Sequence, residues 1–173
     1  AVVAGACAPD DGADAGTTTD TMTTTPPAAS AAAPTDAQIA MIVVTANSAD
    51  SAAGEVAKTK GTDAEVKAFG QRMVTDHSAV NKQATDLATK LNVTPEESDM
   101  SRSMQSDAQS HMSMLQNASG TEFDKAYIDH EVTMHQQVLD ALDQQLIPNA
   151  QNAELKSLLE TVRPAIAAST TQR

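Results

Sequence analysis

Histidine, glutamate and methionine are concentrated in one short stretch of this chain. Residues 124–142 read DKAYIDHEVTMHQQVLDAL and contain His130 and His135, two of the four histidines of the protein. Imidazole, carboxylate and thioether groups all bind transition metals, so the stretch is a candidate metal site. Such residues also occur on helix surfaces and in helical cores, and the choice depends on where a helix would place them.

The apolar residues of this stretch fall on one stripe of an α-helix when successive residues are rotated by about 100°. The stripe consists of Ile128, Val132, His135, Leu139, Leu142 and Leu146. We therefore expect His135 to point into the core, with Glu131 one turn before it. His130 lies about 140° away from His135, so the stretch forms at most two half-sites on different faces.

A second histidine that we expect to face inward is His77. Apolar residues recur around it at alternating spacings of four and three, which is typical of the contact line in a left-handed helical bundle. That line contains Val66, Gly70, Met73, His77, Val80, Ala84, Leu87 and Leu91. Two interpretations stay open. The histidines either hydrogen-bond to each other or to nearby carboxylates inside the core, or they bind a metal together with Asp76 and Glu131.

Methionine next to histidine raises the further possibility of a copper site. Met73 precedes His77 by four residues, and Met134 follows His130 by four. Thioether and imidazole ligands suit Cu(I), although methionine also fills irregular helical cores. One face of segment 96–117 carries Met100, Met104, His111 and Leu115. The candidate copper ligands are Met73, His130, Met134 and His111.

The composition favours an all-α fold. The aromatic residues are Phe69, Phe123 and Tyr127. A core built from Ala, Val, Leu, Ile and Met suits interlocking helices better than a sheet. Capping boxes are predicted to begin at Thr35, Thr62 and Thr94. The sequence predicts an antiparallel bundle of four to five helices near 36–60, 62–91, 96–117, 121–147 and 152–168.

Charge and missing motifs exclude several functions. The chain carries 23 Asp and Glu against 11 Lys and Arg, which argues against binding to nucleic acid or to an anionic lipid surface. The sequence contains no glycine-rich phosphate loop, no G-x-S-x-G elbow and no H-E-x-x-H motif. No stretch approaches the roughly 18 apolar residues that span a bilayer. A binding or structural role is therefore favoured over an enzyme.

The first 35 residues are typical of a lipoprotein signal and linker. AVVAGAC, residues 1–7, resembles the end of a bacterial lipobox, in which the only cysteine, Cys7, would become the lipidated residue. An ordinary unpaired cysteine is the alternative. Residues 8–35 are rich in Thr, Ala, Pro and Asp and contain no Lys or Arg, which predicts a disordered linker before a domain at 36–173. We expect export to the periplasm or cell envelope, with a lipid anchor in the membrane.

Three segments resemble a bacterial family, domain-of-unknown-function family 4142 of the ferritin-like superfamily. They are GEVAKTKGTDAEVKAFGQRMVTDHSAVNKQ (54–83), ASGTEFDKAYIDHEVTMHQQVL (118–139) and NAELKSLLETVRPAIAA (152–168). The resemblance implies a ferritin-like helical bundle over about residues 36–168, in an exported protein that is often a lipoprotein. It does not imply an established activity.

The resemblance also implies site residues. The characteristic polar positions of the family fall on Glu55, Asp76, His77, Tyr127 and His135. Relatives commonly carry a histidine where this chain has Ser169, which indicates a lost ligand or a divergent or truncated end. The candidate metal ligands are therefore His77, His135, Asp76, Glu131 and Glu55, supported by Tyr127.

Three functional hypotheses follow from these residues. The first is a module that binds copper, zinc or iron. The second is a structural or stress-associated envelope protein whose histidines only hold the core together. The third, a di-metal oxidoreductase, is disfavoured because such centres need more carboxylates.

Overall fold

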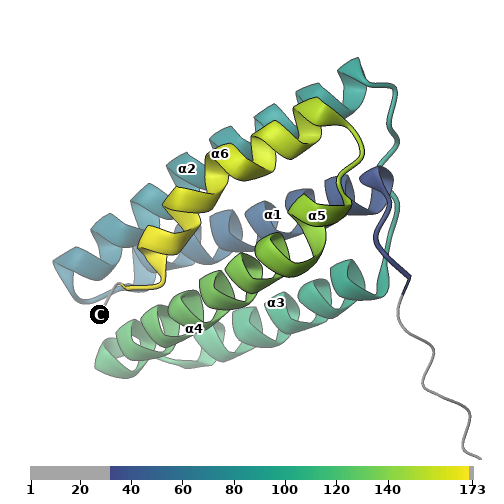
Figure 1. The fold of residues 1–173 in the computed structure, drawn as a ribbon. Helices are drawn as coiled ribbons and strands as arrows, with labels where there is room; N and C mark the ends of the chain where they lie inside the picture. Colours follow the sequence, from purple (N-terminus) through teal and green to yellow (C-terminus); the bar gives the residue numbers. More distant parts are fainter. Residues whose placement is uncertain (1–31, 172–173) are drawn as a thin grey trace, which may run out of the picture. The chain divides into compact units, whose positions relative to one another are not determined.

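The structure is a computed structural model that describes residues 32–171, so the predicted lipidation site Cys7 and most of the predicted linker 8–35 lie outside the described residues. Every regular element between residues 32 and 171 is helical (Figure 1). The elements are α1 (Asp36–Lys60), α2 (Ala64–Lys90), α3 (Asp99–Asn117), α4 (Gly120–Ala141), the π-helical turn η1 (Leu142–Leu146), α5 (Ile147–Asn149) and α6 (Ala153–Ser169). Because α4, η1 and α5 are continuous, this part of the chain forms five helices, and the predicted all-α class is confirmed.

The helix starts agree only in part with the predicted capping boxes. Thr35 and Gln38 form the predicted box at the start of α1. The predicted cap at Thr62 is wrong: Asp63 caps α2, because the hydroxyl and N–H of Thr62 donate to the carboxylate of Asp124 on α4. The cap predicted at Thr94 is also wrong, because α3 begins later, after a box between Ser98 and Ser101.

Two apolar clusters fill the interior. One contains Ile39, Ile42, Val43, Ala84, Leu142, Leu146, Ala150, Leu155 and Leu159. The other contains Ala53, Ala57, Val66, Phe69, Met73, Leu115, Phe123 and Tyr127. Along α1, α2 and α4, the residues between the two clusters include a set of polar side chains. We call this set the polar layer: Asn47, Asp50, His77, Glu131 and His135.

The predicted contact line on α2 is confirmed in its buried positions, whereas the stripe predicted on α4 is partly wrong. His135, Leu142 and Leu146 are buried as expected. Val132 is only half-buried, while the neighbouring Glu131 is 1% exposed. The reason is that α4 turns the side of Glu131 and His135 toward Asp50 on α1, so a polar line replaces part of the apolar one.

Helices α1 and α2 approach each other at two glycines. A Cβ atom added to Gly54 would lie 2.7 Å from the carbonyl oxygen of Gly70, and one added to Gly70 would lie 2.9 Å from the carbonyl oxygen of Gly54. Real Cβ atoms do not approach a backbone oxygen so closely. The two helix backbones can therefore come this close only because both residues are glycine. None of the helices between residues 32 and 171 has both the length and the apolar character needed to cross a membrane.

We predict that Gly54→Ala destabilises the protein. Alanine has a higher helix propensity than glycine and would by itself stabilise an exposed helix by about 1 kcal/mol. At this position its methyl group would push α1 away from α2, and we expect a net loss of about 1–3 kcal/mol in the free energy of unfolding. Urea denaturation measures the sign, and a more stable variant would contradict the close contact.

Candidate metal centre

Three polar side chains from three different helices converge in the polar layer. They are Asp50 on α1, His77 on α2 and His135 on α4. One potential ligand atom from each residue lies within 4.8 Å of the corresponding atoms of the other two. The two imidazole rings meet edge to face, with 5.4 Å between their centroids and 71° between their planes. The two histidines therefore face each other across the bundle.

Hydrogen bonds define the tautomer of His77. The amide nitrogen of Asn47 donates to the carbonyl of Val43, which leaves the amide oxygen of Asn47 as the acceptor at 2.8 Å from Nδ1 of His77. Nδ1 therefore carries the proton, and a carboxylate oxygen of Asp50 lies 3.3 Å from the same atom. Because the proton is on Nδ1, Nε2 of His77 carries the lone pair. Asp50 lies on the Nδ1 side of the ring, so an ion shared by Asp50 and His77 would replace the Nδ1 proton and its hydrogen bond to Asn47.

His135 has the same tautomer and a free lone pair. Its Nδ1 donates to the backbone carbonyl of Glu131 at 2.8 Å. Its Nε2 is buried and has no hydrogen-bond partner. Histidine ligands of metals typically donate the other ring N–H to a carbonyl or carboxylate in this way, which fixes the ring for coordination.

Glu131 adds a second set of unpartnered atoms. Its carboxylate lies 3.6 Å from Nδ1 of His135, and both carboxylate oxygens are buried without a hydrogen-bond partner. Tyr127, one turn earlier, is fully buried, and its hydroxyl lies close enough to the carboxylate of Glu131 to shift the pKa of both groups, although their geometry falls short of a regular hydrogen bond. Buried polar atoms are normally paired, so several unpaired ones in one place indicate a missing partner.

Burial shifts the pKa values of these groups toward their uncharged forms. Desolvation, followed by repulsion from His135, lowers the pKa of His77 to about 4, and desolvation also lowers the pKa of His135. Desolvation raises the pKa of Asp50 well above its usual range; it does the same for Glu131, where the nearby charge of Asp50 adds to the effect. Neutral imidazoles are the form that binds metals, and a cation would favour ionisation of the carboxyls.

A cavity of about 450 Å³ leads to the two histidines. Its volume lies within the range of about 300–1,000 Å³ that is typical of ligand pockets. Most of its lining is apolar and comes from α1, α2, α4, η1 and α6, for example Ile42, Val80, Val138, Leu159 and Ile166. The cavity gives an ion or a small molecule access to His77 and His135.

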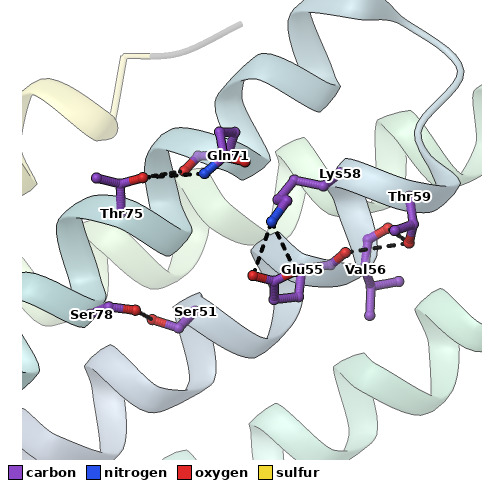
Figure 2. A network of polar contacts seen from close by, with 8 residues as sticks. All are labelled: Ser51, Glu55, Val56, Lys58, Thr59, Gln71, Thr75 and Ser78. Carbon is purple, nitrogen blue, oxygen red and sulfur yellow. Dashed lines mark hydrogen bonds and ion pairs between the residues drawn. The ribbon is translucent and has the colours of Figure 1, made fainter.

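The structure separates some of the residues that the sequence grouped together. Asp76 is exposed and lines the cavity, but Asp50 rather than Asp76 accompanies the histidines. Glu55 is exposed and pairs with Lys58 at 3.0 Å (Figure 2). Ser169, where relatives commonly have a histidine, lines the same cavity as His77 and His135.

Sequence reasoning missed Asp50, although a signal was present. The buried apolar residues Ile39, Val43, Ala46, Ala53 and Ala57 of α1 follow one line of the helix, which steps from Ala46 directly to Ala53. A spacing of four and three would place a residue of the same line at position 50, where the aspartate is found. The interruption of an apolar line by one acidic residue was therefore the available clue. Asn47, which orients His77, had no comparable signal.

The candidate copper ligands are also divided. Met73 is 2% exposed and belongs to an apolar cluster, whereas His111 and His130 stack on each other between α3 and α4. Met134 lines a small cavity beside this histidine pair. The polar layer and the stacked pair are thus different sets of side chains, although Asp50 and Glu131 of the polar layer line the same small cavity.

We predict that Glu131→Gln stabilises the metal-free protein more at pH 7 than at pH 4. A carboxyl whose pKa is raised in the folded state makes its full contribution to stability below its unfolded pKa of about 4.5. This contribution is lost as the pH rises through the higher pKa of the folded state. The difference in the free energy of unfolding between the variant and the wild type should therefore grow with pH, by up to about 1.4 kcal/mol per pH unit.

Urea denaturation in the presence of a chelator measures this difference. The control is Glu160→Gln, which changes an exposed carboxylate on α6. Equal pH dependence of the two variants would show that burial of Glu131 does not shift its titration.

Comparison with known proteins identifies a family but no characterised relative. The family described as "Domain of unknown function (DUF4142)" matches residues 21–172. Neither the curated proteins nor the solved structures contain a match to the chain. Because the match covers most of the sequence, the chain belongs to the DUF4142 family.

Proposed function

We propose that this protein binds one divalent transition-metal ion through Asp50, His77 and His135. The observation that carries the proposal is the convergence of these three donors from three helices, with Nε2 of His135 buried and unpartnered. Two neutral imidazoles and one carboxylate supply two nitrogen donors and one oxygen donor, a common ligand set of metalloproteins.

A purely structural role for the polar layer explains less. The hydrogen bond between His77 and Asn47 would stabilise the core without any ion. It leaves Nε2 of His135 without a partner, and within residues 32–171 Tyr127 is the only side chain that offers a hydrogen bond to the buried carboxylate of Glu131. Each buried unsatisfied polar group costs about 1–3 kcal/mol, and the cost is larger for charged groups. A cation near these atoms would remove much of that penalty.

The donor set favours zinc or ferrous iron. Zinc is commonly held by histidine and carboxylate ligands, and two histidines with one carboxylate also hold ferrous iron in many proteins. Cu²⁺ binds the same donors tightly, so the metal found in the cell would also depend on supply. Three protein ligands leave at least one coordination position for water or a small molecule.

We also propose that the protein is exported and held at the cell envelope by a lipid on Cys7. This proposal rests on the sequence AVVAGAC and on the linker that follows it. A linker of about 28 residues would let the helical domain move on the order of 30 Å from its anchor.

We predict that substitution of any ligand of the centre weakens binding of Zn²⁺ or Co²⁺ by at least about 100-fold, since even changes to supporting residues typically cost about 10–100-fold. The ligand variants are His77→Ala, His135→Ala and Asp50→Asn. Isothermal titration with the chelator-treated protein measures the affinity. A metal concentration of about 100 times Kd should stabilise the wild type by about 2.7 kcal/mol.

Asp76→Asn is the matched control, because Asp76 is an exposed carboxylate next to His77. This variant should bind metal as the wild type does. If the wild type gains no stability with Zn²⁺, Co²⁺, Fe²⁺ or Cu²⁺, the polar layer is structural. If Asp76→Asn loses affinity and Asp50→Asn does not, the ligand assignment is wrong.

We predict that bacteria fed an alkyne analogue of a fatty acid incorporate it into this protein at Cys7. Click labelling and gel fluorescence measure the incorporation after expression with a complete export signal. Cys7→Ser should abolish the label, because no other cysteine is present in the sequence. A label that persists in Cys7→Ser would contradict the proposed anchor.

A further inference from the structure

A second pair of histidines lies outside the candidate metal centre. His111 on α3 and His130 on α4 stack face to face, with 3.4 Å between ring centroids and 16° between ring planes. His111 is 4% exposed, and its Nε2 is buried without a hydrogen-bond partner. A second unpartnered imidazole nitrogen therefore faces the interior at a separate place.

Both stacked histidines line a cavity of about 230 Å³ together with two methionines. Met112 follows His111 on α3, and Met134 is one helical turn after His130 on α4. The cavity is thus bordered by two imidazole and two thioether side chains from two helices. Met114, by contrast, is 56% exposed and does not line this cavity.

The two imidazoles are available as neutral donors. Desolvation, followed by repulsion from His130, lowers the pKa of His111 to about 4, although a backbone hydrogen bond at Ala126 acts in the opposite direction. Desolvation also lowers the pKa of His130, partly offset by the charge of Asp107. Neutral imidazole carries the lone pair that binds a metal.

We propose that His111, His130, Met112 and Met134 form a second metal site, for a soft monovalent ion of the Cu(I) class. Thioether and imidazole donors select Cu(I), whereas the Asp50, His77 and His135 centre offers a carboxylate that suits harder divalent ions. The inner wall of the cavity also carries Asp50 and Glu131, so the cavity borders the polar layer. This inference does not depend on metal binding at the first centre.

Binding requires the two rings to separate. Lone pairs of two stacked parallel rings lie in different planes, so they cannot both point at one ion. His130 is only half-buried and can turn about its side-chain torsions, while the buried ring of His111 stays in place. An aromatic stack is weak compared with the affinity of a metal site, so the rings can separate when an ion binds. Loss of the stack on binding is therefore part of the proposal.

The test is a titration of the full chain with Cu(I) under anaerobic conditions, in competition with a chromophoric Cu(I) chelator. We expect one Cu(I) ion to bind in the His77→Ala/His135→Ala variant as it does in the wild type. Met112→Leu/Met134→Leu keeps the side-chain volume and should weaken binding at least tenfold. His130→Gln should weaken it to a similar extent. Met114→Leu is the matched control and should bind as the wild type does.

A second measurement on the wild-type protein does not depend on variants. Silver(I), a redox-inert substitute for Cu(I), should shift the NMR signals of the methyl groups of Met112 and Met134 and leave that of Met114 unchanged. Equal Cu(I) affinity of wild type and Met112→Leu/Met134→Leu would overturn the proposal. So would loss of Cu(I) binding in a folded His77→Ala/His135→Ala variant, because Cu(I) would then occupy the first centre.

Discussion

The contact between α1 and α2 sets the geometry on which the polar layer depends. Gly54 and Gly70 let the two backbones approach each other, and their carbonyl groups occupy the space that side chains would fill. The hydroxyls of Ser51 and Ser78 lie 3.4 Å apart across the same pair of helices (Figure 2). Asp50 lies one turn before Gly54, and its carboxylate is 3.3 Å from Nδ1 of His77 on α2. A wider helix pair would leave these groups too far apart to share an ion.

The polar layer lies between the two apolar clusters and destabilises the fold. Burial favours neutral imidazoles and neutral carboxyls, so histidine and carboxylate pKa values move in opposite directions in one small volume. Without a cation, the layer retains polar atoms that have no partners. An ion would pair with those atoms and favour ionised carboxyls. The same groups that weaken the empty fold would therefore stabilise the occupied one.

The two candidate sites differ in the chemistry of their donors. The first combines two histidines with a buried carboxylate and opens to the larger apolar cavity. The second combines stacked His111 and His130 with methionine side chains in a smaller cavity. Hard and borderline ions favour nitrogen and oxygen, whereas Cu(I) favours sulfur and nitrogen. The two proposed sites would therefore select different metals within one helical domain.

Composition and hydrophobic periodicity determined the helical class, the contact line of α2 and the inward direction of His77 and His135, and the capping box at Thr35 determined the start of α1. Periodicity did so because spacing along a helix follows directly from the chain. The tertiary structure decided which carboxylate joins the histidines. Asp76 is next to His77 in the sequence but points about 100° away on the helix, so Asp50 from another helix takes that place. Likewise, the burial of Glu131 and the stacking of His111 on a histidine of α4 depend on how each helix is rotated against its neighbours. That rotation results from packing of several helices at once, and no local pattern of residues encodes it.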